Sequence, residues 1–127
     1  MDPDTFVIVT AYNEADLIGA TLDALASAFP AAHVLLADDG STDATVSVAA
    51  ARGAHAVSTA RMLGKGEAAT LAAREALSNA KALGDLERAP IFVLCDGDLG
   101  ESAGELAALA RAVADGEDFA GELVSCA

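Results

Sequence analysis

Short apolar runs, rich in β-branched side chains, recur along the 127-residue chain. They lie at residues 6–9, 33–37, 54–58 and 91–95, and the third of them is the weakest. Runs that are too short for a helix and are bounded by polar residues predict buried parallel strands. A further apolar segment near residues 119–124 is a candidate fifth strand.

Longer segments with helical periodicity separate these runs. Between the first two runs, Asn13 is a suitable N-cap for a helix that Pro30 ends. The apolar face of this helix is formed by residues at helical spacing, namely Leu17, Ile18, Thr21, Leu22 and Leu25. Three further helices are expected, one ending near Arg52, one over residues 64–83 and one over residues 102–113.

Strands and helices therefore alternate along the whole chain. This order predicts an α/β fold, an open and mostly parallel sheet of four or five strands with helices on both faces. A chain of this length fits one compact domain, so residues 1–127 are expected to form a single unit. In open sheets of this kind, ligands bind beyond the carboxyl ends of the strands.

The charge balance narrows the classes of ligand. Twenty Asp and Glu residues against seven Lys and Arg give a net charge of −13. Binding to a nucleic-acid backbone relies on clustered basic residues and is therefore not expected. A phosphate-bearing ligand needs local compensation instead, from a divalent cation, a helix N-terminus or a single well-placed lysine.

Other bulk features favour a cytoplasmic protein. No apolar run approaches the roughly 18 residues of a membrane span, and the acidic N-terminus lacks the pattern of a secretory signal. Cys95 and Cys126 are the only cysteines in the sequence, too few for a zinc site or a disulfide framework.

Four polar clusters follow the predicted strands, at residues 10–14, 38–43, 64–67 and 96–98. The carboxyl ends of parallel strands lie at one edge of a sheet, so the four clusters predict one composite site.

The last cluster, Asp96-Gly97-Asp98, has the chemistry of a metal site. Two carboxylates that flank a glycine can place oxygen ligands near one hard divalent ion and leave positions for phosphate oxygens. The same three residues could equally form a plain turn.

The second cluster contains more acid than its structural role requires. Residues 41–43 can cap the following helix, and Asp38 and Asp39 are not needed for that purpose. A carboxylate here could accept a hydrogen bond from a base imide or a ribose hydroxyl.

Gly64-Lys65-Gly66 opens a long predicted helix. Backbone N–H groups and the helix dipole favour an anion at such a start, and Lys65 adds a positive charge. Tyr12, the only tyrosine of the chain, could stack on a base or pack against a loop.

Taken in order, the four clusters resemble those of family 2 glycosyltransferases, which have the GT-A fold. The resemblance is carried by residues 9–14, 37–43, 64–68 and 94–99 and extends over nearly the whole chain. Residues 98–103 are similar to bacterial members and to relatives that act on phosphoglycerate or polyprenyl phosphate. The resemblance implies the nucleotide-sugar-binding half of a hexosyltransferase.

The resemblance also implies a role for individual residues of the first two clusters. Ala11, Tyr12 and Glu14 would border the nucleoside. Asp38 and Asp39 would contact the base or the ribose.

The last two clusters would hold the phosphates and the sugar. Lys65 would lie near the nucleotide, and Asp96, with Gly97 beside it, would approach the ribose or the donor sugar. Asp98 would coordinate Mg²⁺ or Mn²⁺ bridging the diphosphate of a UDP- or GDP-linked sugar. Such an ion stabilises a leaving nucleoside diphosphate.

Family members are about twice as long as this chain, by the same resemblance. The acceptor-binding part and the general base are therefore expected to lie outside residues 1–127, and no residue is assigned as a catalytic base. Transfer by this chain alone is not expected. A sheet that stops early would expose an edge strand and apolar surface, which predicts self-association through that edge.

Two other functions stay open at this point. One is a nucleotide-binding module without turnover, acting as a regulator or pseudoenzyme. The other is a sugar-nucleotide nucleotidylyltransferase, although residues 10–14 lack the glycine-rich, basic loop that such enzymes carry. The residues also leave open the base and sugar of the donor, the acceptor and the stereochemical outcome.

Overall fold

The computed structural model describes residues 5–83 and 91–114. Strands and helices alternate in this part of the chain, as the apolar pattern predicts. The candidate strand at residues 119–124 lies outside the described residues. The elements in chain order are β1 (Thr5–Ala11), α1 (Ile18–Ala28), β2 (His33–Asp38), α2 (Thr45–Ala51), β3 (His55–Ser58), α3 (Lys65–Leu83), β4 (Ile91–Asp96), the 3₁₀ helix η1 (Gly100–Glu105) and α4 (Leu106–Ala114).

The four strands form one parallel sheet in the order β3-β2-β1-β4. The predicted α/β fold class is therefore confirmed. Strand β1 is central, and its Thr10 lies opposite Ala37 of β2 on one side and Asp96 of β4 on the other. The carboxyl ends of these three strands thus meet at one edge of the sheet.

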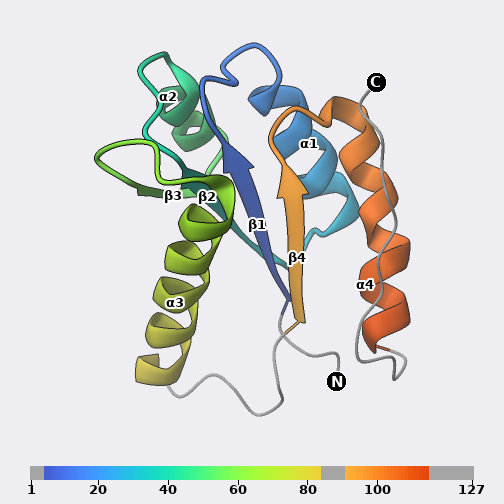
Figure 1. Ribbon diagram of the computed structural model, residues 1–127. Coiled ribbons are helices and arrows are strands. Elements are labelled where there is room, and N and C mark those ends of the chain that lie inside the picture. Colours follow the sequence, from blue (N-terminus) through green and yellow to red (C-terminus); the bar gives the residue numbers. More distant parts are fainter. Residues whose placement is uncertain (1–4, 84–90, 115–127) are drawn as a thin grey trace.

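Helices cover both faces of the sheet, with α3 on one face and α1, α2 and α4 on the other (Figure 1). Alternation along β1 divides its side chains between the two layers, because successive side chains of a strand point to opposite faces. Ile8 packs against Ala68 and Ala72 of α3, whereas Val7 and Val9 face the opposite layer. The small alanines of α3 let this helix lie close to the sheet.

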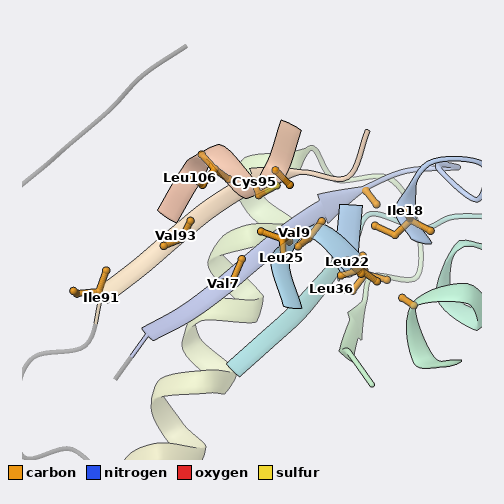
Figure 2. Packing of buried hydrophobic residues seen from close by; sticks show 13 residues of the cluster. Val7, Val9, Ile18, Leu22, Leu25, Leu36, Ile91, Val93, Cys95 and Leu106 are labelled. Carbon is orange, nitrogen blue, oxygen red and sulfur yellow. The ribbon is translucent and has the colours of Figure 1, made fainter. Parts of the chain in front are cut away.

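The larger part of the core lies between the sheet and α1, α2 and α4 (Figure 2). Fully burying one aliphatic side chain of this kind contributes about 1.5–3 kcal/mol. The largest side chains of this cluster with no exposed surface are Ile18, Leu25, Leu36, Val7 and Val9.

Strand β4 lies at the edge of the described sheet, and its Leu94 side chain is 64% exposed. Self-association through this edge stays a prediction. None of the described helices combines the length and the apolar character needed to cross a membrane.

Candidate functional site

A pocket of about 290 Å³ opens at the carboxyl ends of β1 and β4, next to the first turn of α3. Eight of the nine residues that the sequence assigns to a site line it, and Asp38 is the exception. The lining residues are Thr10, Ala11, Tyr12, Glu14, Asp39, Met62, Gly64, Lys65, Asp96, Gly97 and Asp98.

Alternation along the strands explains why Thr10 and Asp96 meet. Thr10 shares its face of β1 with Ile8, and Asp96 shares its face of β4 with Phe92. Ile8 and Phe92 belong to the layer covered by α3. Both polar side chains therefore point toward the N-terminus of that helix.

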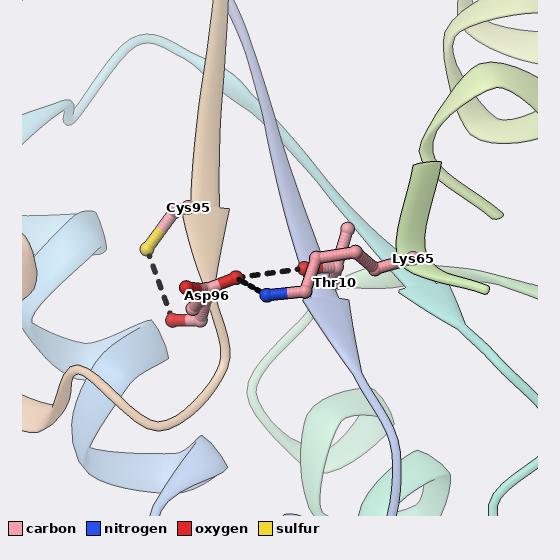
Figure 3. Close-up of polar contacts among 4 residues, drawn as sticks. All are labelled: Thr10, Lys65, Cys95 and Asp96. Carbon is pink, nitrogen blue, oxygen red and sulfur yellow. Dashed lines mark hydrogen bonds and ion pairs between the residues drawn. The ribbon is translucent and has the colours of Figure 1, made fainter. Parts of the chain in front are cut away.

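Lys65 and Asp96 form an ion pair at the centre of this arrangement (Figure 3). The Lys65 Nζ atom lies 2.9 Å from Asp96 Oδ1, and the Thr10 hydroxyl donates to the same oxygen over 3.3 Å. The Lys65 side chain is 70% exposed and that of Asp96 48%, so the pair is readily opened by a ligand. A phosphate group placed here could take the positive charge of Lys65 from Asp96.

Asp39 joins the end of β2 to the loop at residues 59–64. Its carboxylate accepts the backbone N–H of Leu63 over 2.7 Å and that of Gly64 over 3.0 Å. Gly40, with φ of +86°, lies so close to this loop that a Cβ atom there would stand 2.8 Å from the Arg61 carbonyl carbon. Asp39 is only 5% exposed, yet it lines the pocket.

Asp38 occupies a different environment from its neighbour. It is 2% exposed, and its Oδ1 atom accepts the backbone N–H of Ser41 over 3.3 Å. Its carbonyl oxygen accepts the N–H of Thr59 over 3.0 Å. The structure thus places Asp38 away from the pocket lining, where it stabilises the turn that follows β2.

The loops after β1 and β2 are joined through Asn13. Its backbone N–H donates to the Ser41 hydroxyl over 2.8 Å, and its Oδ1 atom accepts the N–H of Thr42 over 2.8 Å. The predicted N-cap role of Asn13 is wrong, because α1 begins only at Ile18, after Leu17 as N-cap. With φ of 52°, Asn13 instead turns back toward the second loop.

Glu14 lies in a strongly negative part of the pocket. Partial burial raises the pKa of its carboxyl, and repulsion from Asp98, Asp43 and Asp96 raises that pKa further. The positive charge of Lys65 acts in the opposite direction. Charge of this sign and density favours a divalent cation near these carboxylates.

The oxygen donors present suit Mg²⁺ or Mn²⁺. Proteins commonly hold Mg²⁺ through one or two carboxylates together with substrate phosphates, and Asp96 and Asp98 both line the pocket. No group of three or more His, Cys, Asp or Glu side chains within residues 5–83 and 91–114 is placed to hold a metal ion.

Three lining residues have no role of their own assigned from the sequence, namely Thr10, Met62 and Gly64, although Thr10 and Gly64 lie within two of the four polar clusters. Thr10 could have been found from the sequence, because it shares its side of the first strand with Phe6 and Ile8. Met62 lies in a loop whose course depends on Asp39 and Gly40, and no periodicity marks it. Its side chain is 57% exposed and adds an apolar surface to the pocket.

Crystal structures of glucosyl-3-phosphoglycerate synthase from Mycobacterium tuberculosis are similar to this chain. One, in complex with Mn²⁺, UDP and glucosyl-3-phosphoglycerate, is 28% identical with a TM-score of 0.67. Another, with Mn²⁺, UDP-glucose and phosphoglyceric acid, is 27% identical with the same TM-score. The match covers 91% of this chain, which spans 41% and 40% of those two chains.

The chain also matches a protein-family model over most of its length. No curated protein matches the chain. The model described as glycosyl transferase family 2 matches residues 6–125. This range takes in all four polar clusters and every residue that lines the pocket. The chain therefore belongs to glycosyl transferase family 2.

Proposed function

We propose that this chain binds a UDP-linked hexose together with Mg²⁺ or Mn²⁺ and presents it for glycosyl transfer. The observation that carries the proposal is the convergence of four sequence clusters on one pocket at the carboxyl edge of the sheet. The 28% identical synthase from Mycobacterium tuberculosis, crystallised with Mn²⁺ and UDP, supports UDP as the nucleotide.

Six of the lining residues have a role in this proposal, and Asp98 is the last of them. Tyr12 and Ala11 border the base, while Asp39 accepts a hydrogen bond from the base or the ribose. Lys65 exchanges its ion pair with Asp96 for a diphosphate oxygen. Asp96, released from Lys65, turns to a ribose or sugar hydroxyl.

Asp98 would hold the cation. When bound, Mg²⁺ or Mn²⁺ supplies the positive charge that stabilises the leaving nucleoside diphosphate. The chain itself contributes the geometry, because Asp96 at the end of β4 and Asp98 in the turn after it line the same pocket.

Thermal denaturation with UDP or GDP, each with and without Mn²⁺, tests the proposal. A ligand at a hundredfold excess over its Kd adds about 2.7 kcal/mol of stability to the native state. We expect a shift of this size with UDP and Mn²⁺ together and a much smaller shift with GDP. Asp98→Asn should abolish the part of the shift that depends on Mn²⁺.

Asp23→Asn is a matched control, since Asp23 lies on α1 outside the pocket lining and forms an exposed ion pair with Arg52. It should behave like the wild type. A UDP shift that is the same with and without Mn²⁺ would contradict the metal site. If UDP binds but the complete protein transfers no sugar from UDP-glucose, a nucleotide-binding module without turnover is the better description.

A further inference from the structure

A buried hydroxyl lies directly behind the turn that carries Asp98. Thr21 of α1 has no exposed surface. Its hydroxyl donates to the carbonyl oxygen of Gly97 over 2.7 Å and accepts the backbone N–H of Gly100 over 2.8 Å. The two bonds span the turn from its first residue to its last, with Asp98 between them.

The hydroxyl has a second potential acceptor in its own helix. The carbonyl oxygen of Leu17 lies 3.1 Å from Thr21 Oγ1, which is longer than the contact to Gly97. A hydroxyl has a single proton to donate, so the shorter contact takes it. Thr21 therefore uses its donor and its acceptor capacity on the same turn.

The rest of the turn is also fixed from below. The N–H of Gly97 donates to the carbonyl oxygen of Thr10 over 2.8 Å, and a Cβ atom on Gly97 would stand only 3.1 Å from that oxygen. Gly100 is buried and has φ of +58°. The turn is thus bonded at both ends, at Gly97 to β1 and α1 and at Gly100 to α1. The backbone at Asp98 therefore has little freedom.

We propose that Thr21 is a positioning residue for the metal and diphosphate site. It sets the backbone of the turn, and through it the direction of the Asp98 carboxylate, without touching the ligand. This inference rests on the proposed function of Asp98 as the metal ligand. Residues that orient a metal ligand in this way typically change metal affinity by roughly 10-fold to 100-fold when they are removed.

A purely structural role is the alternative, in which Thr21 only satisfies two buried backbone groups. Three variants separate the two roles. Thr21→Val keeps the shape of the side chain and removes the hydroxyl. Thr21→Ser and Thr21→Ala both lack the methyl group, and only the serine retains the hydroxyl.

The measurement is calorimetric titration of the full chain with UDP, in the presence and absence of Mn²⁺, alongside the electron paramagnetic resonance signal of bound Mn²⁺. We expect Thr21→Val and Thr21→Ala to weaken UDP binding in the presence of Mn²⁺ by roughly 10-fold or more. UDP binding without Mn²⁺ should change by less than twofold. Thr21→Ser should restore both the affinity and the resonance signal.

Two results would overturn the positioning role. The first is wild-type affinity for UDP and Mn²⁺ in folded Thr21→Val or Thr21→Ala. The second is a loss of affinity in Thr21→Ser as large as that in Thr21→Ala, a comparison that holds even if the valine variant does not fold. A wild-type chain that binds UDP equally well with and without Mn²⁺ identifies a different failure, that of the proposed metal site itself.

Discussion

Two segments that line the pocket are held in opposite ways. The turn at residues 97–100 is fixed from behind by Thr21, which is fully buried and does not line the pocket. The loop at residues 59–64 is fixed by Asp39, whose carboxylate lines the pocket that the loop helps to form. One attachment point is thus separate from the pocket lining, and the other is part of it.

This difference has a physical consequence for binding. A change at Thr21 alters the geometry of the turn, and with it the direction of the Asp98 carboxylate, but removes none of the side chains that line the pocket. A change at Asp39 removes a side chain that lines the pocket and an attachment point of the loop at once. On the proposed function, ordering of the loop at residues 59–64 is expected to be coupled to nucleotide binding, whereas the order of the turn is expected not to depend on the ligand.

Asp39→Ala tests this coupling and has the largest expected effect. The N–H groups of Leu63 and Gly64 lose a charged acceptor, and hydrogen bonds to charged groups contribute about 1.5–3 kcal/mol each. We expect a loss of about 3 kcal/mol in the free energy of unfolding, because water replaces part of the interaction in this exposed loop. Urea denaturation measures this loss of stability. In calorimetric titration, UDP binding should fall below detection.

Asp39→Asn keeps one acceptor oxygen and should lie between the alanine variant and the wild type in both measurements. Unaltered UDP affinity in a folded Asp39→Ala protein would show that the loop and the ligand are independent, and the comparison of the two segments would fail.

A pair of glycines gives the next effect in size. Gly40 and Gly53 have nearly equal φ angles of +86° and +83°, so an alanine at either position carries a similar backbone penalty. A Cβ at Gly53 would meet nothing within 4 Å, whereas one at Gly40 would press on the backbone at Arg61 and Met62. We expect the free energy of unfolding of Gly40→Ala to be about 1–2 kcal/mol lower than that of Gly53→Ala. This difference lies toward the lower end of the usual cost of overpacking.

The same two glycine variants also test whether contact with Gly40 orders the loop at residues 59–64. Gly40→Ala should also weaken UDP binding, because the loop at residues 59–64 must shift away from Asp39. Gly53→Ala should bind UDP like the wild type. Equal stability and equal affinity in the two variants would mean that contact with Gly40 does not order the loop.

The fold was predictable from the sequence because its signals are local. The run at residues 91–95 became β4 (Ile91–Asp96), and the alanine-rich segment at residues 64–83 became α3 (Lys65–Leu83). Apolar residues confined to short runs specify strands, and the polar residues that follow each run mark its carboxyl end. The approximate location of the site follows from the same two features.

The different positions of Asp38 and Asp39 can be predicted from the alternation of side chains along the second strand. Leu35 and Ala37 face α3, so Asp39, two residues further, continues on the same side toward the start of that helix. Asp38 shares its side with Leu36, which packs in the layer of α1 and α2. Period-two counting along the strand would have placed only Asp39 at the pocket.

The contacts of Asn13 and Thr21 were not predictable in this way. Asn13 joins two loops that are 28 residues or more apart in sequence, and its φ of 52° follows from that contact. Thr21 occupies an apolar helical position, and its partners Gly97 and Gly100 become apparent only when α1 packs against the turn after β4. Both depend on tertiary packing rather than on local pattern.

The smallest expected effect is a change in the pKa of Glu14. This pKa responds directly to the opposite charges near the two segments. The turn contributes Asp98, which raises the pKa of Glu14, and the helix after the loop contributes Lys65, which lowers it. Asp98→Asn should therefore lower the pKa of Glu14, and Lys65→Ala should raise it further. Side-chain NMR titration of Glu14 in the three proteins measures these shifts, and a pKa that is the same in all three would contradict them.

The raised pKa also fixes the sign of a stability effect. The native state binds a proton on Glu14 at a pH where the unfolded chain has already released it, so stability falls as pH rises from the ordinary pKa of glutamate through the raised one. Above that window the full repulsion from Asp98, Asp43 and Asp96 acts on the carboxylate, and below it the repulsion is absent. Glu14→Gln cannot ionise and should gain stability over the wild type at neutral pH and little in acid. Mn²⁺ with UDP should reduce this gain, because a cation beside Asp98 offsets the charge that repels Glu14. A gain in stability that is equal at neutral and at acid pH would show that repulsion of the Glu14 carboxylate does not destabilise the native state.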